Sequence, residues 1–146
     1  MCGAAECLRF VSSPDVIVEE FPWGPHEWMV KPPLTDSTNL MLVRVIMPAG
    51  TAHQFHRHPH FEEAVYCLEG RLEQWVGKQS RILLPGDVAH VKKDQVHGSY
   101  NIFDEPCTFL AMMASPDFKE PGLIDVCREE PWCSLKTPID YSNKSL

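Results

Sequence analysis

Histidines and acidic side chains gather in one stretch of this chain, residues 50–70, in a spacing that suits metal binding. The stretch contains four of the seven histidines and two adjacent glutamates. His56 and His58 are two residues apart, so in a β-strand their imidazoles point to the same face. A later segment, residues 85–101, contributes His97. Imidazoles combined with a carboxylate form a ligand set that divalent transition metals accept.

Strand alternation divides these residues between two faces. One face is expected to carry Gln54, His56 and His58, and the other His53, Phe55 and Arg57. After a bend at residues 59–61, Glu62 and Glu63 fall on opposite faces, and alternation does not say which of them faces the histidines. In the later segment, His97, Ser99 and Asn101 are expected to share a face.

The spacing of these residues resembles the first motif of the cupin superfamily. That motif runs Gly, five residues, His-x-His, three or four residues, Glu, six residues, Gly. The matching positions are Gly50, His56, His58, Glu63 and Gly70, in the four-residue variant. The family spacing therefore selects Glu63, and not Glu62, as the acidic member of the site.

The later segment resembles the second cupin motif, with matches at Gly86, His97 and Asn101. Lys92 stands where the family usually has Pro, and Asp94 where it usually has Gly, so the turn before His97 departs from the family pattern. Fifteen residues separate Gly70 from Gly86, a short spacer similar to those of small single-domain microbial cupins.

The resemblance implies one divalent transition metal, such as iron, nickel, manganese, copper or zinc, bound by His56, His58, Glu63 and His97. It also implies a metal-dependent enzyme that acts on a small polar or phenolic substrate, by dioxygenase, isomerase, decarboxylase or lyase chemistry. Two alternatives stay open. One is a non-catalytic cupin that binds a small molecule or a metal. The other is a metal-free barrel in which the histidines bond one another and Glu63.

A general base beside the metal would favour an enzyme over a binding protein. The candidates are Tyr66, Tyr100, His60 and Glu62, but alternation turns all except His60 away from the expected pocket face. His53, His60 and His90 are expected on the surface or beside the ligands, with His60 nearest the site. His26 lies between Trp23 and Trp28, which we expect to cover one mouth of a barrel, and a surface or capping role is expected for it.

Short apolar strands separated by turns every eight to twelve residues predict an all-β sandwich or barrel. The expected strands are residues 16–20, 39–47, 62–69, 71–76, 79–84, 87–91, 96–101 and 107–114, with 62–69 and 71–76 forming a hairpin around Gly70. Prolines between residues 22 and 33 exclude a central strand there, except around residues 27–31. Arg44 is expected in an ion pair at a strand edge or in the pocket.

Among all-β architectures, the cupin resemblance selects the antiparallel double-stranded β-helix, a jelly-roll barrel. We expect the barrel at residues 39–114. Residues 1–38 form an arm that packs on the barrel or on a partner subunit, and residues 115–146 form a wrapping tail. Within the tail, Ser115-Pro116-Asp117 has the pattern of a helix start, and residues 123–127 that of an added edge strand. The two arms favour a homodimer.

Composition narrows the partners. A net charge of −7 and a pI near 5.4 oppose binding to nucleic acid or anionic membranes. No run of 18 apolar residues predicts a membrane span, and the first residues lack the pattern of a secretion signal. The six cysteines form no C-x-x-C pair. Together these features predict a cytoplasmic protein with reduced thiols. The cupin resemblance adds a small-molecule ligand.

Overall fold

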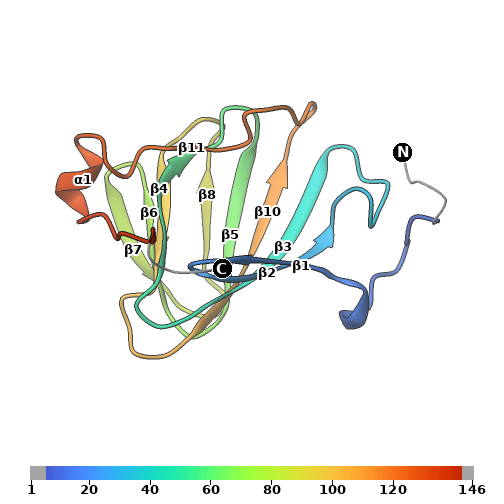
Figure 1. Ribbon diagram of the computed structural model, residues 1–146, viewed down its shortest axis with the longest axis horizontal. Coiled ribbons are helices and arrows are strands. Elements are labelled where there is room, and N and C mark those ends of the chain that lie inside the picture. The colour runs from blue at the N-terminus through green and yellow to red at the C-terminus, as the bar shows by residue number, and fades with distance from the viewer. Residues whose placement is uncertain (1–5, 143–146) are drawn as a thin grey trace.

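Two antiparallel sheets face each other in a jelly-roll barrel, which confirms the expected double-stranded β-helix (Figure 1). The computed structural model describes residues 6–142. The six-stranded sheet has the order β1 (Ile17–Phe21), β2 (Gly24–Val30), β3 (Leu40–Met47), β10 (Cys107–Ala114), β5 (Glu62–Glu69) and β8 (Val88–Val91). The five-stranded sheet has the order β11 (Ile124–Asp125), β4 (Ala52–Arg57), β9 (His97–Tyr100), β6 (Leu72–Val76) and β7 (Gln79–Leu83).

The main core lies between the sheets and is built largely by two neighbouring strands. On β10 every second residue from Cys107 to Met113 is buried, as expected for a strand with one face on the core. Its partner β3 turns Val43, Val45 and Met47 to the same interior. Most of these apolar residues, such as Val43, Val45 and Met113, form one wall of the space in which the predicted site lies.

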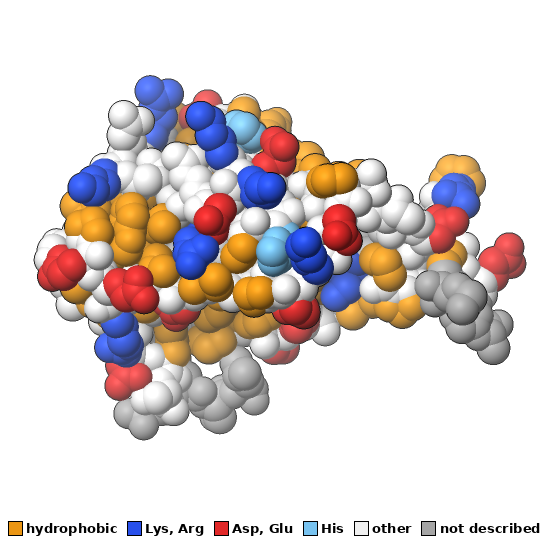
Figure 2. Space-filling view, turned by 90° about the horizontal axis from the view of Figure 1, so that it is seen from above, with side chains coloured by type: hydrophobic (Ala, Val, Ile, Leu, Met, Phe, Trp, Pro, Cys, Tyr) orange, Lys and Arg blue, Asp and Glu red, His pale blue; other side chains and the backbone are white. Residues whose placement is uncertain are grey.

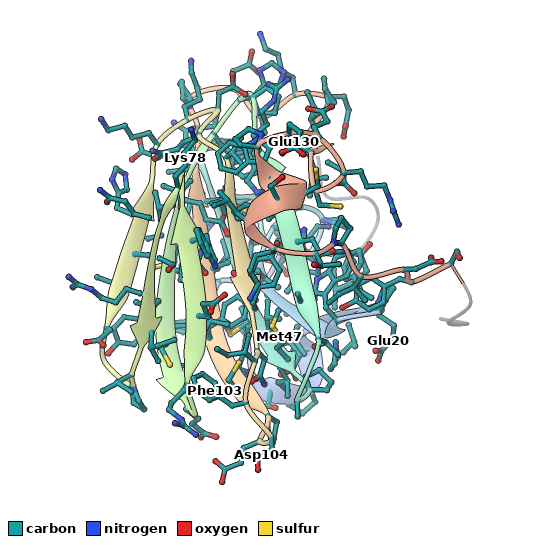
Figure 3. The ribbon with its side chains drawn as sticks, turned by 90° about the vertical axis from the view of Figure 1, so that its left-hand side faces the viewer. Glu20, Met47, Lys78, Phe103, Asp104 and Glu130 are labelled. Carbon is teal, nitrogen blue, oxygen red and sulfur yellow. The ribbon has the colours of Figure 1, made fainter. Side chains whose placement is uncertain are left out.

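A second, smaller core lies on the outer face of the five-stranded sheet. Phe55 and Tyr100 point outward from β4 and β9 and pack against Trp132. Trp132 begins α1 (Trp132–Leu135), the four-residue helix that lies over this sheet in Figure 3. The tail thus hides aromatic side chains that would otherwise face water.

In the tail, residues 115–142, the predicted helix start is absent and the predicted edge strand is present. No helix begins at Ser115, whose hydroxyl instead donates to the His60 carbonyl at 2.6 Å and accepts from the Asp117 N–H. The expected edge strand is present as β11, which pairs with β4. Further along, Gln54 makes two hydrogen bonds with the backbone of Ile139, so its amide holds the tail as a neighbouring strand would.

The predicted hairpin around Gly70 is wrong. β5 pairs with β10 and β8, whereas β6 pairs with β7 and β9, so the chain changes sheets at Gly70. Gly70 has φ +74°, and a Cβ there would lie 2.7 Å from the Pro106 carbonyl oxygen. A corner between packed sheets and a hairpin turn both call for glycine, and the local sequence does not distinguish them.

The proline-rich segment forms more strand than predicted. β2 begins at Gly24, includes Pro25, and lies between β1 and β3. Pro25 is tolerated because it stands at the start of the strand, opposite Glu20 near the end of β1. Arg44 pairs with Glu27 across β3 and β2 at 2.9 Å, so the ion-pair alternative for this arginine is the correct one.

The turn before His97 has the positive φ that usually calls for glycine, although Asp94 stands at that position. Asp94 has φ +64°, the one positive φ at a non-glycine residue in the described chain. Aspartate tolerates this conformation better than most residues, and its carboxylate also pairs with Arg57 of β4. The Asp94 N–H donates to the His58 carbonyl at 2.9 Å, so this turn is held against the end of β4, next to the predicted ligands His56 and His58.

Charges of both signs are interspersed on the face shown in Figure 2, with apolar patches between them.

Cys67, Cys107, Cys127 and Cys133 are free thiols, while Cys7 is disulfide-bonded, so the expectation of reduced thiols holds for those four and fails for Cys7. Within residues 6–142, no helix has the length and apolarity needed to cross a membrane.

Candidate metal centre

Side chains on β4, the strand that leads into His56 and His58, do not alternate regularly between the two faces of the sheet. The β4–β9 register advances three residues on β4, from His53 to His56, against two on β9, from Ser99 to His97. This β-bulge places His53 and His56 side by side in the cavity, while Phe55 between them points to the outer core. The prediction that His53 and His56 lie on opposite faces is therefore wrong.

Two residues of β9 accommodate the bulge. Gly98 lies directly beneath it, where a Cβ would come within 3.2 Å of the Phe55 nitrogen and 3.3 Å of the Gln54 carbonyl carbon. The Tyr100 hydroxyl accepts a hydrogen bond from the Phe55 N–H at 3.1 Å and so satisfies a donor that the bulge removes from the ladder. The contiguous Gly98-Ser99-Tyr100 of β9 thus shapes the histidine-bearing strand.

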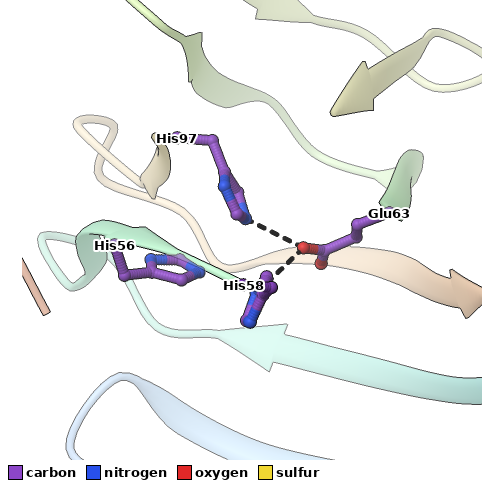
Figure 4. Close-up of side chains that lie close together, drawn as sticks. All are labelled: His56, His58, Glu63 and His97. Atoms are coloured by element: carbon purple, nitrogen blue, oxygen red, sulfur yellow. Dashed lines mark hydrogen bonds and ion pairs between the residues drawn. The ribbon is translucent and has the colours of Figure 1, made fainter. Parts of the chain in front are cut away.

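The structure brings the four predicted ligands together from three segments. One ligand atom from each of His56, His58, Glu63 and His97 can be chosen so that all lie within 4.8 Å of one another, and all four side chains are buried. Figure 4 shows the two Glu63 contacts, 2.8 Å from Oε2 to His97 Nε2 and 3.2 Å to His58 Nε2. Glu62 points away and pairs with the exposed His90 at 2.9 Å.

Each of the three histidines is oriented by a backbone carbonyl. Nδ1 lies 2.6 Å from the Gln54 oxygen in His56, 2.7 Å from the Gly122 oxygen in His58, and 3.0 Å from the Gln95 oxygen in His97. A carbonyl can only accept, so each Nδ1 carries the proton and each Nε2 has a free lone pair in the neutral ring. This is the arrangement by which proteins orient histidine ligands of metals.

The site also has a deficit of positive charge that a cation would correct. His58 and His97 face an acceptor at both nitrogens, a carbonyl at Nδ1 and the Glu63 carboxylate at Nε2. A neutral imidazole has one N–H and satisfies only one of them. A divalent metal among the Nε2 atoms and the carboxylate satisfies all of these groups together. The residues present therefore fit such a metal.

Protonation equilibria reflect the same electrostatics. Burial alone raises the pKa of Glu63, but the charges and hydrogen bonds of His97 and His58 outweigh burial and hold this pKa well below its ordinary value. Burial lowers the pKa of His97, yet the Glu63 carboxylate overcomes that effect and the pKa is raised. His56 has no such contact, and burial keeps its pKa well below the ordinary value.

The four residues face a cavity of about 960 Å³ between the two sheets. One wall is apolar and comes from β3 and β10: Met41, Val43, Val45, Phe109, Ala111 and Met113. The other wall comes from β4 and β9 and carries the histidines. A donor cluster on one wall of a large, mostly apolar cavity is the usual form of a small-molecule site.

Two further histidines line the cavity. His26 is buried, so of its two expected roles, surface or capping, the surface position is wrong, and its Nδ1 lies 3.2 Å from the Gly24 carbonyl oxygen. His53 also lines the cavity. The four candidate bases are absent from the described lining, as alternation predicted for Tyr66, Tyr100 and Glu62 but not for His60. The sequence feature that could have indicated the inward position of His53 is Gly98, because a glycine in a strand often marks a bulge in the neighbouring strand.

Residues 43–113 match the family model of the cupin domain. With the jelly-roll topology and the histidine–glutamate cluster, this match shows that residues 43–113 form a cupin domain. A comparison with curated proteins finds no match.

Among solved structures, KdgF from Halomonas sp. is similar, with 17% identity and a TM-score of 0.65, covering 76% of this chain and 94% of that one. Lactobacillus farciminis oxalate decarboxylase has 22% identity and a TM-score of 0.67, and the match covers 79% of this chain and 35% of the decarboxylase chain. The DMSP lyase DddQ from Ruegeria pomeroyi DSS-3 has 30% identity and a TM-score of 0.56, and the match covers 64% of this chain and 46% of DddQ.

Proposed function

We propose that this protein is a metal-dependent cupin enzyme that binds one divalent transition metal and acts on a small polar or phenolic molecule. The observation that carries the proposal is the convergence of His56, His58, Glu63 and His97, with their donor atoms within 4.8 Å, at the wall of an apolar cavity. Iron, nickel, manganese, copper and zinc all accept such a ligand set.

The metal would supply Lewis-acid or redox chemistry to a ligand oxygen. The chain contributes orientation and exclusion of water. The Gln54, Gly122 and Gln95 carbonyls fix the three imidazoles, and the wall from β3 and β10 surrounds the reacting molecule with apolar groups. The reaction would be of the dioxygenase, isomerase or lyase type, and the 30% identity with a DMSP lyase supports the lyase type.

One observation favours the alternative, a non-catalytic cupin that binds a small molecule or a metal. None of the four candidate general bases lies on the described lining of the cavity. Lewis-acid or redox chemistry at a metal does not require such a base in every reaction, so the enzyme remains the first proposal. Turnover of a bound ligand distinguishes the two.

The proposal is tested by loading chelator-treated protein with each of the five metals and measuring bound metal by elemental analysis. We expect one metal per chain. His97→Ala should lose most of it, because the remaining donors leave the site incomplete. The matched control is His90→Ala, which removes an exposed histidine paired with Glu62. A wild-type protein that retains none of the metals would overturn the proposal, and metal-dependent turnover of a phenol or hydroxy-carbonyl compound would favour the enzyme over the binder.

A further inference from the structure

His53 differs from the other four histidines of the cavity in its hydrogen bonding. In His26, His56, His58 and His97, Nδ1 lies against a backbone carbonyl. Within residues 6–142, the imidazole of His53 has no hydrogen-bond partner, although it lines the same cavity. A half-buried imidazole without a partner leaves both ring nitrogens available to a ligand.

Ring stacking limits how His53 can contact such a ligand. One face stacks on His56, with ring centroids 3.8 Å apart and planes 11° apart, and another stacking contact is made with Trp23 at 4.6 Å and 10°. Since Trp23 also stacks on Phe21, the rings form a continuous series that ends at a predicted metal ligand. The faces of His53 are therefore occupied, and its edge, which carries the nitrogens, is the part available for recognition.

The rest of the cavity indicates what kind of molecule would meet that edge. The facing wall of β3 and β10 is apolar and suits a hydrocarbon or aromatic body. Apart from Glu63, whose charge the bound metal would offset, the charged residues on the lining are mainly acidic: Glu19, Glu120, Asp125 and Asp140, against Lys31 and Arg128. Lys31 already lies over the Trp28 ring at 4.6 Å. This charge distribution opposes entry of a dicarboxylate and admits a neutral ligand.

We propose that His53 is a specificity residue that hydrogen-bonds the bound molecule, and that this molecule is a neutral chelator with an apolar or aromatic body. Two neighbouring oxygens, as in a catechol or a hydroxy ketone, would reach the metal and the His53 edge together. The inference rests on the proposed function, because it places the ligand beside the metal held by His56, His58, Glu63 and His97.

The test is a calorimetric titration of protein loaded with the metal it retains best, with catechol and oxalate as probes. His53→Phe keeps the ring and its stacking but removes both nitrogens. We expect it to retain the metal and to bind catechol about five- to tenfold more weakly, the usual effect of losing one hydrogen bond. His53→Asn or His53→Gln, which places a polar group near one ring nitrogen or the other, should restore part of the affinity. His90→Phe is the matched control and should bind catechol as the wild type does.

Each outcome separates this inference from the proposed function. If His53→Phe binds catechol like the wild type, His53 does not contact the ligand, and the metal-site proposal stands. If His53→Phe loses the metal, the residue supports the metal site and the specificity role is wrong. Tighter binding of oxalate than of catechol, or no binding of catechol, overturns the ligand class. A wild type that retains no metal overturns both proposals.

Discussion

The hydroxyl of Tyr100 accepts a hydrogen bond from the backbone N–H of Phe55 at 3.1 Å, and this contact accompanies the bulge that turns His53 into the cavity. Both residues belong to the outer core under α1. The packing of the tail on the outer face of the sheet is therefore connected to the arrangement of histidines on its inner face.

Tyr100→Phe should lower the free energy of unfolding by about 1–2 kcal/mol, because the buried Phe55 N–H loses its acceptor. Urea denaturation measures the effect. Tyr66→Phe is the control, since the Tyr66 hydroxyl has no hydrogen-bond partner within residues 6–142, and it should leave stability almost unchanged. Equal losses in the two variants would mean that the Phe55 contact contributes nothing specific.

Gly98→Ala should disturb the bulge directly. The added Cβ would lie 2.8 Å from Tyr100 Cε2 and 3.2 Å from the Phe55 nitrogen, so either the ring or the strand must move. Such crowding costs about 1–3 kcal/mol of folding free energy, and we expect weaker metal binding as His56 shifts. Ser80→Ala is the control, because Ser80 is exposed on β7 and lies outside the cavity lining. Unchanged metal affinity and stability in Gly98→Ala would contradict the role assigned to this glycine.

Glu63→Gln should weaken metal binding strongly, whereas Glu62→Gln should not. Glu63 Oε2 contacts two of the histidines, and Glu62 pairs only with exposed His90. The amide removes the negative charge that offsets part of the metal's charge. Competition with a chromophoric chelator gives the two affinities. A larger loss in Glu62→Gln than in Glu63→Gln would place the wrong glutamate in the site.

The metal-free protein should show a pH-dependent contribution from the Glu63–His97 pair. The pKa of Glu63 is lowered in the folded state from 4.5, so its stabilisation is present above about pH 4.5 and lost as the pH falls through the folded-state pKa. The pKa of His97 is raised from 6.5, so its stabilisation is complete below about pH 6.5 and lost as the pH rises through the folded-state value.

The pair is therefore complete in the window between those two values. With metal removed by a chelator, Glu63→Gln should destabilise the protein by about 3 kcal/mol near pH 5.5 and by less near pH 9. His53 and His56, whose pKa values are lowered mainly by burial, occur in both proteins, so much of their effect cancels in the difference. Denaturation curves at the two pH values measure it. A difference that grows toward pH 9 would contradict this ion pair.

We also predict a homodimer. Phe10 is 88% exposed on the segment before β1, and Val18 on the edge strand β1 is 54% exposed. Burial of these side chains against a second copy would remove apolar surface from water. Light scattering should give twice the chain mass of 16.6 kDa, and Phe10→Glu should weaken the assembly. Val88→Glu, at an exposed position of β8, should not, and a wild type at the chain mass would refute the dimer.

The sequence by itself determined the fold class and the identity of the clustered residues. Strand lengths, turn residues and the spacing of His56, His58, Glu63 and His97 are local properties, and each is preserved in the structure. Choosing between Glu62 and Glu63 required the family spacing, because alternation alone only places them on opposite faces.

Tertiary structure decided what depends on neighbours distant in the chain. Gly70 became a corner between sheets and not a hairpin turn, because strand pairing selects between two turns with the same local requirement for glycine. His53 entered the cavity because Gly98 leaves room for a bulge 43 residues away and Tyr100 satisfies its backbone. His58 obtained its orienting carbonyl from Gly122 in the tail. Such contacts form only when the whole chain is packed, and no local pattern encodes them.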